Sequence, residues 1–244
     1  MKKIALFGLL LILIMSIAVP VAFAKPENPG PPDIQQRIFI HFAKPNPAKP
    51  KPPSGETGYY KLLGAKWKNT PVHIEVNPSG LSPGFVLGAI GIAAEEWDDG
   101  DYSGWGGVTP NLFDDTITTT DREYNDLAWT SGKLDKANTL IWGDYPTSGI
   151  IAVTIVWYNV VTKTILEFDI VFDTDYAWGD AKENPDVMDL QNIATHELGH
   201  GAGLDDLYQS AAYRETMYGY SVSGEISKRD LYIGDKAGIT KLYG

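Results

Sequence analysis

A pair of histidines one helical turn apart, His196 and His200, constrains this chain more than any other feature. Side chains at positions i and i+4 lie on the same face of a helix, so both imidazoles can reach one Zn²⁺ at about 2.0–2.1 Å. Glu197 lies between them, near the metal without having to bind it, where a general base acting on a metal-bound water is needed. The spacing favours a metal site over an amphipathic helix whose histidines are merely exposed.

A zinc site of this kind needs a third protein ligand. The chain has four histidines and none follows His200, so the ligand must be a carboxylate if it lies downstream. Gly203 can adopt the left-handed backbone that ends a helix and reverses the chain, which would bring Asp206 back over the metal. The neighbouring Asp205 is the competing candidate. A glutamate on a second helix is a further alternative, although the two downstream glutamates lie in poor helical patterns: Glu215 and Glu225.

Composition restricts the partners of this chain. Its 244 residues include no cysteine, which excludes disulfides, thiolate metal sites and cysteine nucleophiles. The formal net charge of −11 argues against nucleic acid as a partner, because phosphate binding needs a basic surface. With 43% hydrophobic residues the chain can form a globular core.

Residues 1–24 have the pattern of a secretory signal peptide. Lys2 and Lys3 precede an uncharged apolar run, which ends in an Ala-Phe-Ala cleavage site at 22–24. The alternative is a retained membrane anchor, since the run is just long enough to span a bilayer. We therefore expect a secreted, extracellular protein that is associated with a membrane only if this segment is retained.

Residues 25–57 are predicted to form a leader or linker. Prolines dominate this stretch and favour extended polyproline conformations. An apolar island at 38–42 interrupts it, and this island is either a pro-segment strand lying on the domain or an unpaired patch. His41, within the island, is expected to be incidental rather than a metal ligand because of its disordered context.

Residues 58–244 are predicted to form one α+β domain. Alternating or apolar runs indicate strands at 71–77, 116–120, 138–142, 150–158 and 164–173. His73 is expected at the surface of the first strand. In the last strand, three acidic side chains are expected on the face opposite the apolar one: Glu167, Asp169 and Asp173.

Two helix starts have recognisable capping patterns. Ser82 and Pro83 begin a helix that continues to about Asp98, with an apolar stripe of Phe85, Ile92, Ala93 and Trp97. The helix that carries the two histidines is expected to begin earlier, with Asn184 as the N-cap and Pro185 at the first helical position.

The segment from His196 to Asp206 resembles the extended metzincin motif HExxHxxGxxH/D, in the variant with Asp as third zinc ligand that snapalysin-like enzymes have. Residues 215–219 resemble the metzincin Met-turn, in which Met217 would lie beneath the zinc ligands as an apolar floor. The resemblance to a matrixin-like catalytic domain covers roughly residues 59–244. It implies a twisted, mostly parallel five-stranded sheet with one antiparallel edge strand, an active-site helix and a C-terminal helix over 236–244.

This resemblance implies a secreted zinc-dependent endopeptidase that hydrolyses peptide bonds through a zinc-bound water activated by Glu197. His196, His200 and Asp206 would hold the single catalytic zinc. A protein or peptide substrate would lie along the edge strand at 150–158, with the wall of the specificity pocket at 218–227, and we expect a monomer. The alternative is a non-catalytic secreted module, either zinc-binding or surface-associated.

The chain also departs from the matrixin pattern. Without cysteine, any latency must use another group, such as a leader residue between 25 and 57. His73 cannot hold a second, structural zinc alone. Some metzincins have a tyrosine two residues after the Met-turn methionine, but this chain has Gly219 there. We therefore do not expect the flanking Tyr218 or Tyr220 to stabilise an oxyanion.

Acidic clusters suggest a calcium ion in addition to zinc, because carboxylates are the hard oxygen ligands that Ca²⁺ prefers. Matrixin-like domains often bind calcium near the segment that matches residues 172–178. A solvated acidic surface is the alternative. The candidate ligands fall into two groups: Asp98, Asp99 and Asp101, and Asp169, Asp173 and Asp175.

Overall fold

The computed structural model describes residues 33–44, 58–102, 104, 110–127 and 134–244. The predicted signal peptide at 1–24 lies outside these residues, as does most of the predicted leader at 25–57. Within the described ranges, no helix has the length and apolar character needed to cross a membrane.

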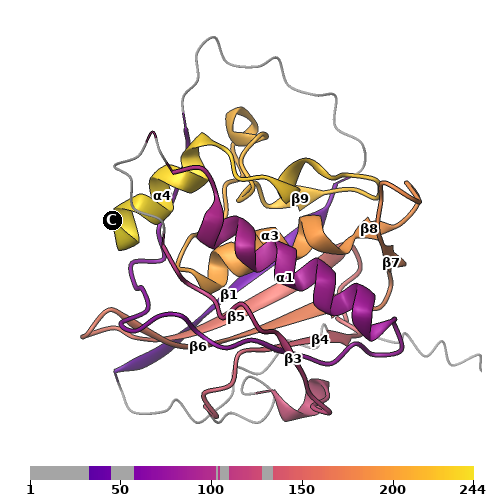
Figure 1. The fold of residues 1–244 in the computed structure, drawn as a ribbon, viewed down its shortest axis with the longest axis horizontal. Helices are drawn as coiled ribbons and strands as arrows, with labels where there is room; N and C mark the ends of the chain where they lie inside the picture. The colour runs from indigo at the N-terminus through magenta and orange to yellow at the C-terminus, as the bar shows by residue number, and fades with distance from the viewer. Residues whose placement is uncertain (1–32, 45–57, 103, 105–109, 128–133) are drawn as a thin grey trace, which may run out of the picture.

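The described residues are built around one mixed seven-stranded sheet in the order β3-β2-β4-β6-β5-β1-β9 (Figure 1). Its strands are β1 (Ile34–Ala43), β2 (Glu75–Val76), β3 (Thr118–Thr119), β4 (Thr139–Gly143), β5 (Ile150–Asn159), β6 (Thr164–Asp173) and β9 (Tyr220–Ser221). A separate parallel pair consists of β7 (Trp178–Gly179) and β8 (Met188–Asp189). The helices are α1 (Pro83–Asp99), α3 (Leu190–Gly201), α4 (Ile233–Tyr243) and the short 3-10 turns η2 (Tyr124–Asp126), η3 (Ser210–Ala212) and η4 (Ser227–Arg229).

The predicted α+β class is confirmed. The pairs β3–β2, β2–β4 and β4–β6 are parallel, and β5 pairs with β6 in the antiparallel direction. These five strands correspond to the expected five-stranded sheet with one antiparallel edge. The sheet is larger than expected, however, because β1 adds antiparallel to β5 and β9 adds parallel to β1.

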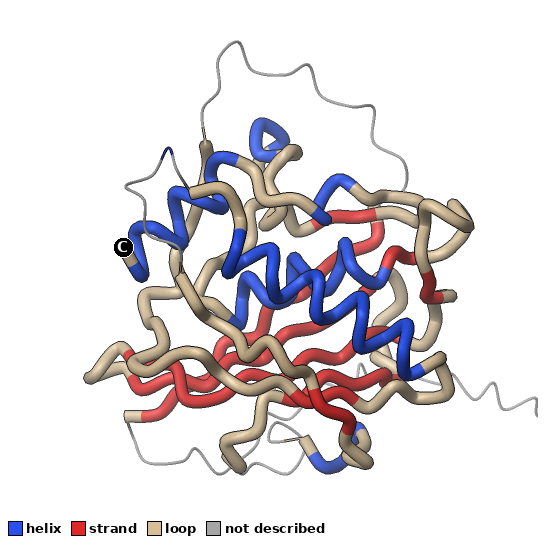
Figure 2. The backbone as a smooth tube through the Cα atoms, in the orientation of Figure 1, coloured by secondary structure: helices blue, strands red, loops and turns tan. Residues whose placement is uncertain are grey.

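Helices α1 and α3 pack against each other over one face of the sheet (Figure 2). The expected start of α1 at Ser82 and Pro83 is correct, but its predicted apolar stripe is partly wrong because Ile92 is 56% exposed. A side chain at this position points away from the buried stripe, whose members recur every three to four residues. That stripe consists of Val86, Ala89, Ile90, Ala93, Ala94 and Trp97.

The acidic face that alternation predicts for β6 does not lie at the surface. Its three acidic side chains are all buried, the most exposed of them at 2%: Glu167, Asp169 and Asp173. The loop before β4 contacts this face at Glu167, whose Oε2 accepts backbone N–H groups from Asp135 at 2.8 Å and Lys136 at 2.5 Å. Alternation alone could not reveal this cover, because it depends on a distant loop. Burial raises the pKa of Glu167 to about 7.

The helix that carries the two histidines begins later than predicted. Asn184 and Pro185 lie in turns, and α3 starts at Leu190. Asp189 is its N-cap, with a carboxylate that accepts the backbone N–H of Asn192 at 2.8 Å. Proline suits a turn as well as a first helical turn, and this is why the sequence pattern placed the start too early.

Candidate metal centre

Helix α3 places His196 and His200 side by side, with ring centroids 4.9 Å apart and ring planes at 89°. The helix ends just beyond His200, and Gly203 has a φ of +106°. A Cβ at Gly203 would lie 2.7 Å from the backbone oxygen of Ala65, so this turn requires glycine for both its backbone conformation and its close packing. The chain then reverses, as predicted.

The reversal brings Asp206 to the two histidines. Its Oδ1 lies 3.3 Å from Nε2 of His196 and 3.4 Å from Nε2 of His200. Ligand atoms that are each about 2.0–2.1 Å from a tetrahedral metal ion are separated by about 3.3 Å. The competing Asp205 points elsewhere and forms an ion pair with Lys61, with an N–O distance of 2.7 Å.

The three facing atoms are poised to bind an ion. The Nδ1 of His196 contacts the carbonyl oxygen of Thr216 at 2.7 Å, and the Nδ1 of His200 contacts that of Leu204 at 3.0 Å. With each Nδ1 donating to a carbonyl oxygen, Nε2 is the ring nitrogen that faces Asp206 and is available as a ligand atom. Both Nε2 atoms and the Oδ1 of Asp206 are buried without a hydrogen-bond partner among the described residues. Such a set of two nitrogens and one carboxylate oxygen fits zinc.

The charge state of Asp206 suits the same role. Burial alone would raise its pKa, but the adjacent imidazoles of His200 and His196 outweigh burial and hold the pKa well below its ordinary value. A buried carboxylate ionised next to two nitrogen ligands is typical of a metal site. The hydroxyl of Tyr208 donates to the second oxygen, Oδ2 of Asp206, at 2.9 Å.

The alternative third ligands lie away from the two histidines. Glu215 accepts the backbone N–H groups of Tyr59 and Gly234, each at a distance of 2.9–3.0 Å. Glu225 accepts the hydroxyl of Ser221 at 2.8 Å and lies in the wall of a pocket. Neither is grouped with the two histidines as a possible metal ligand.

Met217 lies under the helix that carries the histidines. It is 1% exposed, and a Cβ added at Gly199 would lie 2.3 Å from its sulfur. The backbone N–H of Met217 donates to the buried carboxylate of Asp235 at 3.1 Å, and that of Thr216 donates to the same carboxylate at 2.7 Å. This carboxylate therefore fixes the turn that supports the predicted ligands.

Glu197 is fully buried, and both of its carboxylate oxygens are engaged. The hydroxyl of Thr154 on β5 donates to Oε2 at 2.5 Å, and Nδ1 of His41 lies 3.0 Å from Oε1. The same Oε1 is 4.0 Å from Nε2 of His196. Burial works to raise the pKa of Glu197, but the hydrogen bond with His41 and the nearby imidazoles outweigh it and hold the pKa below its ordinary value.

The expectation that His41 is incidental is wrong. Its side chain is fully buried, and its ring lies 3.9 Å from that of His196 between centroids. Two positions earlier, Phe39 stacks on His200 with centroids 4.0 Å apart and planes at 5°. Burial and the neighbouring His196 lower the pKa of His41 to about 4, so its imidazole is neutral. His73, by contrast, lies at the surface as expected.

Sequence reasoning thus missed several residues that contact the predicted site. Alternation of side chains along 38–42 would have placed Phe39 and His41 on one face. Thr154 is the single polar residue in the apolar run 150–157, which was an unused signal. No local pattern singles out Tyr208.

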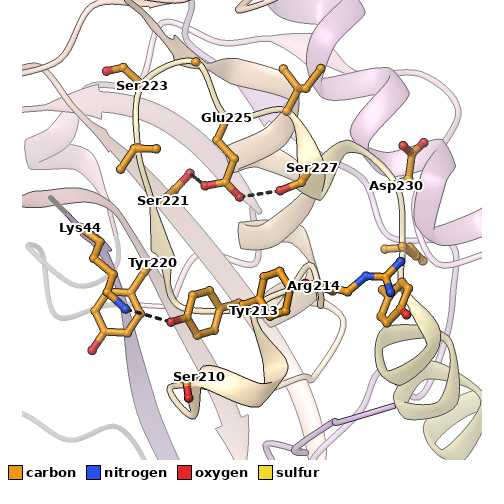
Figure 3. Close-up of a pocket in the computed structure, with 16 residues that line it drawn as sticks. Lys44, Ser210, Tyr213, Arg214, Tyr220, Ser221, Ser223, Glu225, Ser227 and Asp230 are labelled. Atoms are coloured by element: carbon orange, nitrogen blue, oxygen red, sulfur yellow. Dashed lines mark hydrogen bonds between the residues drawn. The ribbon is translucent and has the colours of Figure 1, made fainter. Parts of the chain in front are cut away.

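Figure 3 shows a pocket of about 820 Å³. Its lining includes Tyr220, whose ring packs against Tyr208, and Tyr208 in turn donates to Asp206. The lining contains Tyr218 and the segment 220–227, which is the stretch predicted as a pocket wall except for Gly219. Figure 3 shows Glu225 facing Ser221 and Ser227, whose hydroxyls donate to it at 2.8 and 2.7 Å. Burial opposes the ionisation of Glu225, but the ammonium of Lys228 outweighs burial and lowers the pKa of that carboxyl to about 2.

Only part of the predicted acidic clustering appears. Asp144, Asp173 and Asp175 bring carboxylate oxygens within 4.8 Å of one another, and one oxygen of the buried Asp173 has no hydrogen-bond partner among the described residues. Asp98 is used otherwise, because its two oxygens accept the backbone N–H groups of Leu112 and Phe113.

Comparisons with known proteins point to one family. Residues 157–244 match the Matrixin family. A stretch of 66 residues is 42% identical to metalloendoproteinase 1-MMP of Arabidopsis thaliana and covers 27% of this chain and 17% of that protein. A stretch of 76 residues is 37% identical to matrix metalloproteinase-16 of Homo sapiens and covers 31% of this chain and 12% of that protein.

The C-terminal part of this chain is similar to matrixins. The matched stretch contains the two histidines, Glu197, Asp206 and Met217. The matched stretches span 17% or less of the length of these relatives. The likeness agrees with the α+β fold and with a metalloendopeptidase in general.

Proposed function

We propose that this chain is a zinc-dependent endopeptidase. The observation that carries the proposal is the convergence of three buried, unpartnered ligand atoms from His196, His200 and Asp206, with Glu197 adjoining them. Unpartnered polar atoms in a protein interior are costly, so a cluster of three such ligand atoms fits a bound metal ion. The similarity to matrixins over residues 157–244 supports zinc as that ion.

The roles of the side chains follow from their positions. Zinc held by the three ligands would polarise a peptide carbonyl and make a bound water more acidic. Glu197, with a depressed pKa, is ionised and can take a proton from the attacking water. It then passes this proton to the amine that leaves as the C–N bond breaks. Thr154 positions the carboxylate through its hydroxyl.

A peptide substrate would bind in extended form along β5. Backbone pairing to a strand edge recognises a peptide independently of its sequence. The pocket of about 820 Å³ would then select one substrate side chain, and its lining contains several tyrosines: Tyr213, Tyr218, Tyr220 and Tyr232. We infer that protein or peptide chains with a large apolar residue at that position are the substrates.

A second candidate function is a non-catalytic zinc-binding module. It is favoured by one observation, that both oxygens of Glu197 are engaged by other side chains of the same protein. A general base in this state cannot act until one contact is released.

Metal analysis and hydrolysis of denatured casein separate the two functions. The peptidase proposal predicts one zinc per chain and hydrolysis that is abolished by a chelator and by Glu197→Gln. His73→Ala, which removes a surface imidazole, is the control and should change neither. One zinc per chain without hydrolysis in any form supports the non-catalytic module, and no zinc contradicts both.

We also propose that the protein is exported. The signal-peptide pattern at 1–24 supports export, and matrixins are generally extracellular. The N-terminal sequence of the protein recovered from culture medium should begin at Lys25. Recovery only from membranes, with residues 1–24 intact, would show that the segment is retained as an anchor.

A further inference from the structure

Strand β1 comes from the predicted leader, yet it lies within the sheet between β5 and β9. Its register on β5 runs from Ile34 opposite Asn159 to Phe42 opposite Ile150. On the other side, the backbone N–H of Phe42 donates to the oxygen of Gly219 at 3.1 Å. Figure 1 shows β1, in indigo, alongside β5. A segment of this chain therefore takes the place along β5 where an extended peptide would pair.

The side chains of β1 alternate between two environments. Phe39 and His41 face α3 and are 2% and 0% exposed. Phe39 covers His200, and His41 covers His196 and contacts Glu197. Ile40 faces the opposite side and packs in a separate apolar cluster. One face of the strand thus covers both histidines and Glu197.

We propose that β1 is an internal blocking strand, which occupies the substrate groove and holds the enzyme inactive through His41 until β1 leaves. This inference rests on the proposed peptidase function and adds the regulation of the same site. In place of the cysteine that this chain lacks, the imidazole of His41 contacts the proposed general base, with Nδ1 3.0 Å from Oε1 of Glu197. The backbone of β1 pairs with β5, and its side chains Phe39 and His41 block access to His200, His196 and Glu197.

Competition explains why the block would be effective. A substrate and β1 cannot both pair with the same edge of β5. Because β1 is tethered to the domain, its effective concentration at the groove is on the order of millimolar, well above that of most protein substrates. The block is also reversible in principle, since pairing and packing contacts hold it.

A reversible covalent lock tests the proposal. Ile40 and Val153 are cross-strand partners whose side chains face away from α3. Partners in antiparallel strands have Cα atoms about 4.5–5.5 Å apart, which suits a disulfide. In the variant Ile40→Cys/Val153→Cys these are the only two thiols, because the chain has no cysteine of its own. Oxidation should fix β1 in the groove, and a phosphine reductant should free it.

The expected result is no peptide hydrolysis in the oxidised form and recovery on reduction. Zinc transfer to a chelator, which does not depend on catalysis, should be at least tenfold slower in the oxidised form. Equal hydrolysis and equal zinc transfer in both forms would overturn the proposal. Each single-cysteine variant, which cannot form the lock, should not respond to the reductant.

A second variant tests His41 without the lock. His41→Ala should raise peptide hydrolysis about tenfold, which corresponds to about 1.4 kcal/mol in favour of the open state. His73→Ala is the matched control and should leave the rate unchanged. An unchanged or lower rate in His41→Ala, with the fold intact by circular dichroism, would contradict the role of His41.

Failure of the peptidase proposal is distinguishable from failure of this one. If no form hydrolyses peptides but oxidation still slows zinc transfer, β1 covers a non-catalytic zinc site and the regulatory proposal is overturned. If hydrolysis is present and unaffected by oxidation, the peptidase stands and the blocking strand does not. Absence of zinc from every form would contradict both.

Discussion

At the scale of single residues, the proposed site is organised by contacts behind the ligand atoms. The carbonyl oxygens of Thr216 and Leu204 fix the two imidazoles, and Tyr208 holds the outer oxygen of Asp206. Partners of this kind orient ligands and commonly change metal affinity by about 10–100-fold when lost. Spacing along one helix could predict the histidines, whereas these partners come from distant loops that no local pattern identifies.

Gly219 offers a test of this organisation. A Cβ there would lie 2.5 Å from the ring of Tyr208 and 2.9 Å from Oδ1 of Asp206. Gly219→Ala should therefore displace Asp206 and weaken zinc binding about 10–100-fold in a competitive chelator titration. Gly88→Ala, where a Cβ meets nothing within 4 Å, is the control. Equal zinc affinities for the two variants would argue against Asp206 as a ligand.

At the scale of elements, strand β6 carries buried acidic side chains that have two different structural roles. Its Glu167 fixes the loop before β4, and its Asp173 gathers with Asp144 and Asp175. The strand itself was predictable from alternation, with the correct bounds at 164–173. The burial of its acidic face was not predictable. Alternation shows that the two faces of a strand differ in polarity, but it does not show which other segments cover each face.

The pH dependence of stability should reveal Glu167. Burial raises its pKa to about 7 in the folded state, above the ordinary value near 4.5. The folded chain then binds more protons than the unfolded chain, so the stability from this group falls as pH rises from about 4.5 to 7. Relative to Glu167→Gln, wild type should lose about 1–3 kcal/mol between pH 5 and 8 in urea unfolding. Parallel curves for the two proteins would rule this role out.

Calcium binding is expected at the cluster of Asp144, Asp173 and Asp175. Asp173 is 1% exposed and presents an unpartnered oxygen, which an oxygen-preferring cation would satisfy. Millimolar Ca²⁺ should raise the melting temperature by several degrees, through binding to the folded state alone. Asp173→Asn should remove most of this rise, and the exposed Asp186→Asn should retain it. A calcium response that is the same in both variants would place the ion elsewhere.

At the scale of the whole molecule, the sheet joins a leader strand to a domain that sequence analysis separated from it. The α+β class and the longer strands, β5 and β6, followed from residue patterns. The position of β1 did not, because a short apolar run flanked by prolines pairs only once β5 and β9 present their edges. The boundary at residue 58 stays a prediction, while the function proposed here depends on both parts.

The most direct measurement is the rate of casein hydrolysis by the reduced, zinc-loaded Ile40→Cys/Val153→Cys protein, with and without Glu197→Gln. General acid–base groups contribute about 10²–10⁴-fold to such reactions. We expect the rate to fall by at least 10²-fold on Glu197→Gln, with the zinc content unchanged at one per chain. Equal rates in the two proteins would contradict the account of this chain as a zinc endopeptidase.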